Sequence, residues 1–298
     1  MRHELGDECG LDILYCGDDH MFSGLIISIL SLTKHAQEPL NIYILTGQLY
    51  NRHQQFQALT DDHAAFLNQL VKRENVDSGV TKIDITTQFE ADLPKANINT
   101  LFTPYSMLRL YSDLVPQFSD RILYLDADVV CRRPFEDFYH QSLAGTDFVG
   151  VLDHYGRWFF HHQQRAFDYI NSGMLLMNLD MIRQDKLLTR CRECCRKWPM
   201  IMPDQSAINK LAKHKAFAPE KYNEQQDVQS DTVFQHFSTR WKLWPIVHTV
   251  SVKPWEVDKV HQQLHLHEYD DILAEYQEIM AELDAEGELD AEGELKTE

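Results

Sequence analysis

Apolar and polar residues in the N-terminal part of the chain follow the spacings of strands and helices in alternation. Residues 11–17 (LDILYCG) have the character of a buried strand. Residues 21–35 place their apolar side chains on one face at helical spacing, and residues 40–47 (LNIYILTG) return to strand character. Side chains on one face recur about every 2 residues in strands and about every 3.6 residues in helices, so this pattern predicts a strand–helix–strand unit.

The same alternation continues toward the middle of the chain. We expect a helix over roughly 51–73, a short strand at 81–86 (TKIDIT) and a helix at 105–116 that ends at its proline. The next stretch, 121–130 (RILYLDADVV), is strongly strand-like. Strands that alternate with helices predict an α/β fold whose mostly parallel sheet has helices on both faces. Sheets of this kind bind ligands at the carboxyl ends of their strands.

Two carboxylates, Asp126 and Asp128, follow the apolar residues ILYL in this stretch. A surface turn is one interpretation, since aspartate is common in turns. The apolar residues on both sides favour another, because carboxylates near a core must be paired or must coordinate a metal. In an extended chain, residues two apart point the same way, so both carboxylates can bind one hard cation such as Mg²⁺ or Mn²⁺. The pattern therefore predicts a metal site that binds a diphosphate.

Length, composition and charge restrict the class of protein. The 298 residues are 44% hydrophobic and carry a formal net charge of −18, which suits one large globular domain. An acidic chain lacks the basic face that nucleic acid requires. No apolar stretch is long enough to span a bilayer, and the N-terminal residues MRHELGDECG contain no apolar signal region. We therefore expect a cytoplasmic protein with no stable membrane insertion and no nucleic-acid partner.

Much of the negative charge lies at the end of the chain, where Glu282–Gly287 recurs as Glu288–Gly293. Such a segment buries little apolar surface, so we expect it to be disordered. The predicted organisation is a folded domain over 1–270 and a C-terminal extension over 271–298, which contains the start of a helix and the acidic tail.

Other candidate metal ligands have a simpler explanation. Cys191, Cys194 and Cys195 lie among helix formers without a second cysteine pair, so we expect reduced thiols on a surface helix. The aromatic run 157–162 (RWFFHH) either belongs to the core or forms part of a flap over a bound ligand. Five histidines have no carboxylate at metal-binding spacing and are expected on the surface or in loops beside the ligand: His161, His162, His261, His265 and His267.

Several motifs in a fixed order carry a resemblance to a known family. They are ILYLDADVV, YINSGMLLMNL, PDQSAINKL, QHFSTRWKLW and VKPW. From about Leu11 to about Tyr269 the chain resembles glycosyltransferase family 8, which includes bacterial lipopolysaccharide galactosyl- and glucosyltransferases and glycogenin. The resemblance implies a GT-A fold, with a single Rossmann-like, mostly parallel sheet. It also implies retaining transfer from a UDP-sugar with Mn²⁺ as the cofactor, Mg²⁺ being the alternative.

The resemblance assigns roles to residues that match the family motifs. Arg109 matches an arginine that reaches the donor sugar and diphosphate, a task that suits the planar guanidinium fork. Asp126 and Asp128 match the metal pair, with Ala127 between them beside the ribose. The residues that match the uridine-binding loop are Cys16, Gly17, Asp18 and His20. The residues that match the sugar-binding side are Asp153, Asn171, Ser172, Gly173, Asp204 and Gln205.

The third metal ligand is less clear, because the family pattern of a histidine followed by Lys-Pro-Trp is split here. The stretch HFSTRWKLW keeps His236 and Lys242 at matching spacing but lacks the usual glycine and proline. A literal Lys-Pro-Trp occurs at Lys253–Trp255, with His248 five residues before it. We favour His236, because TVFQHF reads as a strand that leads to it, and keep His248 as the alternative. Lys242 and Lys253 are both candidates for the diphosphate.

The reaction implied by the resemblance is transfer of glucose or galactose from UDP-glucose or UDP-galactose to a glycan or glycoprotein. Arg109, Asp204 and Gln205 are the expected catalytic residues. Gln205 is a neutral amide and a poor nucleophile, which favours front-face displacement with the UDP β-phosphate as the base. A metal-dependent UDP-sugar hydrolase or nucleotidyltransferase is the alternative enzyme, and a sugar-nucleotide-binding protein without catalysis is the alternative outside enzymes.

Overall fold

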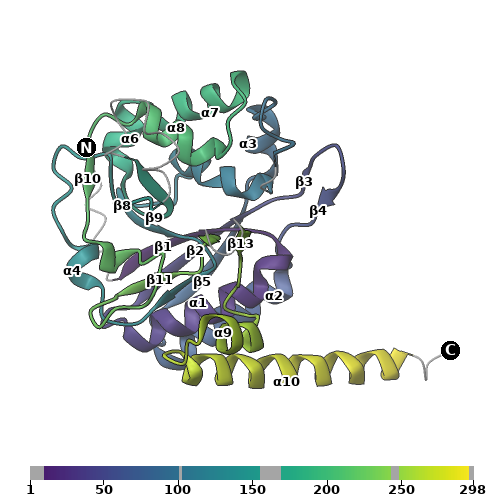
Figure 1. Ribbon diagram of the computed structural model, residues 1–298. Helices are drawn as coiled ribbons and strands as arrows, with labels where there is room; N and C mark the ends of the chain where they lie inside the picture. Colours follow the sequence, from purple (N-terminus) through teal and green to yellow (C-terminus); the bar gives the residue numbers. More distant parts are fainter. Residues whose placement is uncertain (1–9, 101–102, 155–168, 243–247, 295–298) are drawn as a thin grey trace.

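A seven-stranded sheet forms the centre of the molecule, in the order β10-β8-β9-β6-β1-β2-β5 (Figure 1). The computed structural model describes residues 10–100, 103–154, 169–242 and 248–294. All neighbouring strands of this sheet are parallel except β9, which is antiparallel to β6 and β8. The strands are β1 (Leu11–Cys16), β2 (Leu40–Thr46), β5 (Gly79–Asp84), β6 (Arg121–Leu125), β8 (Phe148–Leu152), β9 (Ile170–Asn178) and β10 (Lys215–Phe217). The structure confirms the predicted α/β fold with a mostly parallel sheet.

Helices cover both faces of the sheet, with α6, α7 and α8 on one side and α1, α2, α9 and α10 on the other (Figure 1). The α-helices are α1 (Phe22–His35), α2 (Asp61–Glu74), α3 (Thr86–Ala91), α4 (Glu136–Tyr139), α6 (Leu179–Gln184), α7 (Leu187–Lys197), α8 (Pro203–Leu211), α9 (Val257–Leu264) and α10 (Asp270–Glu294). The 3₁₀ helices are η1 (Asp19–Met21), η2 (Pro104–Leu114) and η3 (Glu220–Tyr222). Three two-stranded sheets complete the fold: β3 (Leu49–Tyr50) with β4 (Gln55–Phe56), β7 (Val129–Cys131) with β11 (Phe234–His236), and β12 (Arg240–Lys242) with β13 (His248–Val250).

The alternation of side chains along β1 divides the core into two layers. Leu11, Ile13 and Tyr15 pack with side chains of α1, α2 and α10, whereas Leu14 and Cys16 pack with η2, α6, α7 and α8. Both sets are buried, which is why the strand reads as a continuous apolar run instead of an alternating one.

Two predicted elements differ from the structure. Where one helix was expected over roughly 51–73, the chain first forms the β3–β4 hairpin and enters α2 only at residue 61. Asn51 accepts the backbone N–H groups of residues 53 and 54 and so closes a turn, and Thr60 caps α2 by accepting from the His63 backbone N–H at 3.2 Å. The helix expected at 105–116 is the 3₁₀ helix η2.

The Asp-Ala-Asp stretch lies in a turn, so the predicted extended geometry is wrong. β6 ends at Leu125, and the Val129 N–H donates to the Asp126 carbonyl oxygen at 3.0 Å. The chain then enters β7, which leaves the main sheet and pairs with β11. Pairing with β11 draws the chain out of the sheet, and the turn makes this change of direction possible.

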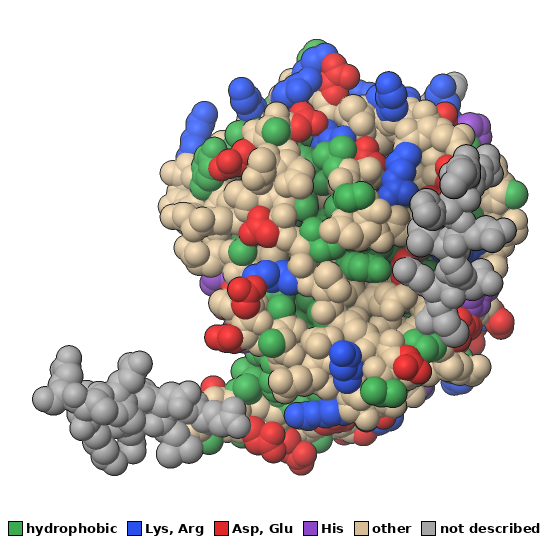
Figure 2. All heavy atoms as spheres, turned by 180° about the vertical axis from the view of Figure 1, so that it is seen from behind, with side chains coloured by type: hydrophobic (Ala, Val, Ile, Leu, Met, Phe, Trp, Pro, Cys, Tyr) green, Lys and Arg blue, Asp and Glu red, His purple; other side chains and the backbone are tan. Residues whose placement is uncertain are grey.

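Helix α10 continues through most of the acidic repeat, where the sequence predicts disorder (Figure 1). Its first turns pack on the core through the buried side chains of Ile272, Leu273, Tyr276 and Ile279. Alanine, glutamate and leucine, which make up much of the repeat, are strong helix formers, so the helix extends beyond the packed turns. Figure 2 shows acidic side chains along the lower edge, where α10 lies, and Lys and Arg side chains at the opposite end of the molecule. None of the described helices combines the length and apolar character needed to cross a membrane.

A chain that ends after Ala285 should keep its fold and its activity. The last side chain known to pack on the core is the partly buried Leu283, so this truncation removes little buried apolar surface. A chain that ends after Leu273 is the matched control. It loses Tyr276 and Ile279, which should lower the free energy of unfolding by about 3 kcal/mol. Urea denaturation measures the free energy of unfolding of both truncated chains. Equal destabilisation by the two truncations would contradict this account.

Candidate active site

Asp126, Asp128 and His236 converge at the carboxyl end of β6. One ligand atom from each lies within 4.8 Å of the others. His236 Nε2 is 3.4 Å from Asp128 Oδ1 and 3.8 Å from Asp126 Oδ2. The antiparallel pairing of β11 with β7 and the hydrogen bond from Phe237 N–H to the Asp128 carbonyl oxygen, at 3.0 Å, bring these distant segments together.

The chemistry of this cluster fits a divalent cation. Asp128 is 7% exposed, and within the described residues its Oδ1 atom has no hydrogen-bond partner, although buried carboxylate oxygens are normally satisfied. Lys253 Nζ donates to the other oxygen of Asp128 and to the Phe237 carbonyl oxygen, the latter at 3.2 Å. Burial by itself would raise the pKa of Asp128, but the ammonium of Lys253 opposes it most strongly, and that pKa lies well below its usual range. The carboxylate is therefore ionised, as a metal ligand must be.

Arg109 connects the cluster of Asp126, Asp128 and His236 to the residues that are predicted to bind the sugar. Its guanidinium is buried, donates from Nη2 to Asp126 Oδ1 at 2.9 Å, and has Nε 3.3 Å from Asp204 Oδ2. Nη1 donates to the Ser172 carbonyl oxygen. The guanidinium also lies over the Tyr124 ring, 4.1 Å from its centroid. These contacts use the planar fork of donors that arginine has and lysine lacks.

The start of β9 and the first turn of α8 form the wall next to this arginine. Gln205 Oε1 accepts from the Ser172 N–H at 2.8 Å, and Gln205 Nε2 donates to Asp153 Oδ2 at 3.1 Å. Ser172 Oγ donates to Asp204 Oδ2 at 3.0 Å. Burial raises the pKa of Asp204, and Arg109 opposes this rise. The structure thus brings together the sequence-predicted residues of the sugar-binding side.

Gly173 lies where the backbone of β9 passes closest to the cluster. Its carbonyl oxygen accepts the Asp126 N–H at 2.8 Å. A Cβ atom at this position would lie 2.2 Å from His236 Cε1 and 2.8 Å from Asp126 Oδ2. Only glycine allows both side chains to occupy their places.

Replacing Gly173 by alanine should therefore displace His236 and lower the affinity for Mn²⁺ roughly tenfold or more. Electron paramagnetic resonance, recorded while Mn²⁺ is titrated into the protein, measures this affinity. Gly79→Ala is the matched control, because the nearest atom to an added Cβ there is Asn68 Oδ1 at 3.6 Å, an ordinary contact. Wild-type affinity in the Gly173 variant would show that the close approach has no role in metal binding.

The predicted uridine loop follows β1. Cys16 is buried at the end of the strand, and burial raises the pKa of its thiol, so the thiol is neutral. Asp18 is also buried, and burial raises its pKa. The exposed His20 has Nδ1 3.3 Å from Asp18 Oδ2. Ala127 is buried, and a Cβ on Gly24 of α1 would lie 2.8 Å from its carbonyl oxygen, so α1 supports the Asp-Ala-Asp turn from behind.

Some of the remaining site residues predicted from the sequence lie within the described part of the chain and others do not. Lys253 contacts the cluster through Asp128. The side chains of Lys242 and His248 and the run 157–162 lie outside the described residues. Cys191, Cys194 and Cys195 are free thiols on α7, as predicted, but they are buried and do not lie on its surface, because they form the face that packs on the core.

The histidines near the end of α9 do have a carboxylate partner, contrary to the prediction. Asp270 contacts His261 Nε2 at 2.8 Å and His267 Nδ1 at 3.1 Å. The two imidazole rings are stacked, with their centroids 4.8 Å apart and their planes inclined by 15°. Stacked, nearly parallel rings cannot both direct an in-plane lone pair at one ion, so the contact is a hydrogen-bonded pairing at the start of α10.

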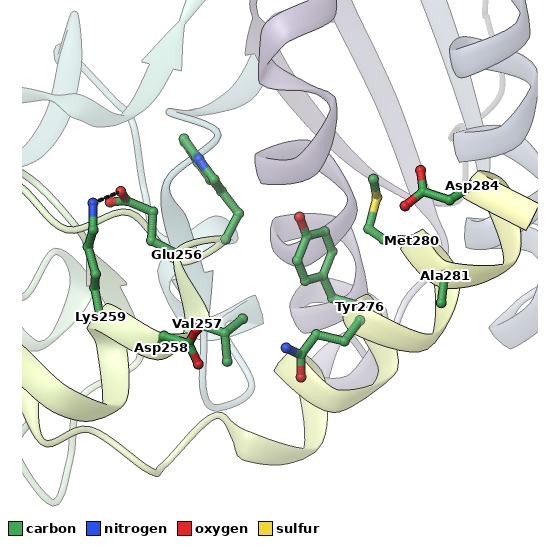
Figure 3. Close-up of a pocket in the computed structure, with 10 residues that line it drawn as sticks. Glu256, Val257, Asp258, Lys259, Tyr276, Met280, Ala281 and Asp284 are labelled. Carbon is green, nitrogen blue, oxygen red and sulfur yellow. Dashed lines mark hydrogen bonds and ion pairs between the residues drawn. The ribbon is translucent and has the colours of Figure 1, made fainter. Parts of the chain in front are cut away.

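An open cavity of about 520 Å³ lies between residues 255–259 and α10 (Figure 3). Glu256, Lys259, Tyr276 and Met280 are among the residues that line it. Among the described residues, none of the predicted site residues lines this cavity. The cavity is therefore separate from the cluster at the end of β6.

Two residues of the site were missed by the sequence analysis. Tyr124 donates its hydroxyl hydrogen to Asp126 Oδ1, yet its position in β6 indicates only a core side chain. Asn223 is fully buried and bonded to both His236 and Asn171. No signal in the sequence identifies Asn223, because its partners lie 13 and 52 residues away.

Solved structures with the same fold are sugar-transferring enzymes. The galactosyltransferase LgtC, in a complex with donor and acceptor sugar analogues, superimposes with a TM-score of 0.63 at 15% identity, over 89% of this chain and 96% of that one. The glycosyltransferase GlyE of Streptococcus pneumoniae superimposes with a TM-score of 0.58 at 17% identity, over 89% of this chain and 63% of that one. At such low identity these matches show the fold, which is of the GT-A type.

The family to which the sequence belongs identifies the class of protein that has this fold and this cluster of side chains, and the class is a glycosyltransferase. The chain belongs to glycosyl transferase family 8, whose family model matches residues 12–259. The lipopolysaccharide 1,2-glucosyltransferase of Escherichia coli K12 is 25% identical over 269 residues, which cover 83% of this chain and 73% of that protein. The lipopolysaccharide 1,3-galactosyltransferase of Salmonella typhimurium is 22% identical over 260 residues, 78% of this chain and 72% of that protein. The chain matches only 21% of the glycosyltransferase GlyA of Streptococcus pneumoniae, at 27% identity over 161 residues, 51% of this chain.

Proposed function

We propose that this glycosyltransferase is a retaining, Mn²⁺-dependent hexosyltransferase that moves glucose or galactose from a UDP-sugar to a glycan or glycoprotein acceptor. The observation that carries the proposal is the convergence of Asp126, Asp128 and His236, with Asp128 Oδ1 buried and without a hydrogen-bond partner among the described residues. Two carboxylates and one imidazole suit a divalent transition metal such as Mn²⁺. When bound, this ion would neutralise charge on the diphosphate of the donor.

The protein supplies two further positive charges next to the cluster. Arg109 contacts Asp126, and Lys253 contacts Asp128. Asp128 raises the pKa of Lys253 against the opposing effect of its burial, so the ammonium stays charged. Positive groups held in a buried site stabilise negative charge as it develops on a leaving diphosphate, and this electrostatic contribution is usually the largest one in catalysis.

The residues on the sugar side support transfer without a covalent enzyme intermediate. Both polar atoms of the Gln205 side chain are occupied, by Ser172 and by Asp153, and an amide is a weak nucleophile. Arg109 and the Ser172 hydroxyl both contact Oδ2 of Asp204, and an ion-paired, hydrogen-bonded carboxylate is a weaker nucleophile than a free one. We therefore propose front-face displacement, in which the departing UDP phosphate accepts the proton of the acceptor hydroxyl.

Two relatives support the choice of sugars and acceptor, since they are named as a lipopolysaccharide glucosyltransferase and a lipopolysaccharide galactosyltransferase. We also propose a cytoplasmic location. The five cysteines in the described part of the chain are free thiols, a state that a reducing compartment maintains.

The test is the release of UDP from UDP-glucose and UDP-galactose, with and without Mn²⁺ and with a panel of glycan and glycoprotein acceptors. The proposal expects fast UDP release only when Mn²⁺ and an acceptor are both present, with the hexose found on the acceptor. Equal release without any acceptor would identify a UDP-sugar hydrolase. Release of UMP from the UDP-sugar, or of pyrophosphate from an added nucleoside triphosphate, would identify phosphoryl or nucleotidyl transfer and overturn the proposal.

A further inference from the structure

Asn223 joins the metal side of the site to its sugar side. It follows η3, is 0% exposed, and contacts two site residues from different strands. Its Nδ2 atom is 3.1 Å from Asn171 Oδ1, and its Oδ1 atom is 3.2 Å from His236 Nδ1. The neighbouring residue Glu224 pairs with β11 through the His236 N–H, at 2.9 Å, which fixes Asn223 against the histidine.

The orientations of the Asn171 and Asn223 side-chain amides follow from one backbone N–H group, which can act only as a donor. The Gly173 N–H lies 2.9 Å from Asn171 Oδ1, so the atom at this position must be the oxygen. At the other end of the same amide, Asn171 Nδ2 donates to Asp153 Oδ2 at 2.9 Å, and carboxylate oxygens are acceptors. Both contacts give the same orientation of Asn171.

The orientation of Asn171 determines that of Asn223. Because Asn171 Oδ1 is an acceptor, Asn223 must present its NH₂ group to it and its oxygen to His236 Nδ1. An oxygen acceptor at 3.2 Å requires the hydrogen of the imidazole to be on Nδ1. Nε2 then keeps a lone pair, and this atom is the one that faces Asp126 and Asp128.

We infer that Asn223 is a positioning residue that selects the Nδ1–H tautomer of His236 and thereby prepares Nε2 to bind the metal. Partners of this kind orient ligand histidines in metal sites generally, and their loss lowers metal affinity roughly 10- to 100-fold. The inference rests on the proposed function, since it concerns the same metal site, but the contact between Asn223 and His236 does not involve the metal, so the tautomer can be measured in the metal-free protein.

The test is the ¹⁵N chemical shifts of the His236 imidazole in metal-free protein at alkaline pH, together with Mn²⁺ affinity from electron paramagnetic resonance. Wild type should show the hydrogen on Nδ1. Asn223→Ala should populate the Nε2–H tautomer and bind Mn²⁺ roughly 10- to 100-fold more weakly. Asn223→Asp keeps an acceptor at nearly the same place and should keep the wild-type tautomer.

Asn178→Ala is the matched control, because it removes an amide with two hydrogen bonds from the far end of β9. It should change neither the tautomer nor the Mn²⁺ affinity. An Nε2–H tautomer in wild type would overturn the inference even if Asn223→Ala does not fold. An unchanged tautomer in Asn223→Ala, or equal loss of it in Asn223→Asp, would overturn it as well. Absence of Mn²⁺ binding with the expected tautomers would instead contradict the proposed function.

Discussion

Replacing Asp128 by asparagine should lower the rate of sugar transfer roughly 10²–10³-fold and leave the fold intact. The change preserves size, but it removes a charged metal ligand and leaves Lys253 beside a neutral amide. Loss of the charged ligand weakens metal binding and so weakens the stabilisation of negative charge on the leaving diphosphate, and a lysine without its carboxylate partner does not replace the metal ion. Initial rates at saturating donor, measured over a range of Mn²⁺ concentrations, give the size of the loss and its dependence on the metal.

Asp12→Asn is the control for this substitution. Asp12 is a buried aspartate of β1 that accepts from the Asn41 side chain at 3.0 Å and has no contact with the cluster in the described part of the chain. It should keep wild-type transfer. Near-normal turnover of the Asp128 variant would mean that Asp126 and Asp128 form only a structural turn.

Replacing Arg109 by methionine should lower the free energy of unfolding by about 3–5 kcal/mol and nearly abolish transfer. The guanidinium side chain is 5% exposed and is paired with Asp126 and Asp204, so its removal leaves two carboxylates with an unpaired negative charge. Urea denaturation measures the stability. Transfer measured well below the melting temperature separates the catalytic defect from unfolding.

The structure contains a matched control in Arg192, a second buried arginine that is paired with Asp92 and Asp113 and lies 5.1 Å from the Tyr111 ring centroid. Arg192→Met should destabilise the protein by a similar amount because it breaks an equivalent network, but it should not reduce transfer by the folded enzyme. Equal activity losses in the two variants would indicate that Arg109 acts only through stability.

The sequence predicts the elements whose side chains follow one period. β1, α1 and β2 are found within a residue or two of their expected positions, because each buries a regular set of apolar side chains. The helix expected from about residue 51 fails where polar side chains decide the local structure, through the turn at Asn51 and the cap at Thr60. Periodicity does not detect such side chain–backbone hydrogen bonds.

In the site, too, the identity of several residues can be predicted from the sequence, whereas their arrangement cannot. The motif order is sufficient to predict Asp126, Asp128 and His236, and the structure brings these residues together. Their geometry follows from the β7–β11 pairing between segments about a hundred residues apart, which no local pattern contains. The same is true of Lys253, which reaches Asp128 across 125 residues. Spacing alone therefore does not predict the contact of Lys253 with Asp128, and the side chain of the other candidate, Lys242, lies outside the described residues.

The most direct measurement of the central claim is the transfer rate as a function of Mn²⁺ concentration for the wild type and for substitutions at each candidate ligand. The account predicts metal-dependent transfer in wild type, large losses in Asp126→Asn, Asp128→Asn and His236→Ala, and a near-normal rate in His248→Ala. A loss at His248 with none at His236 would contradict the assignment of the third ligand. Transfer by wild type that is independent of Mn²⁺, or unimpaired aspartate variants, would contradict the metal site itself.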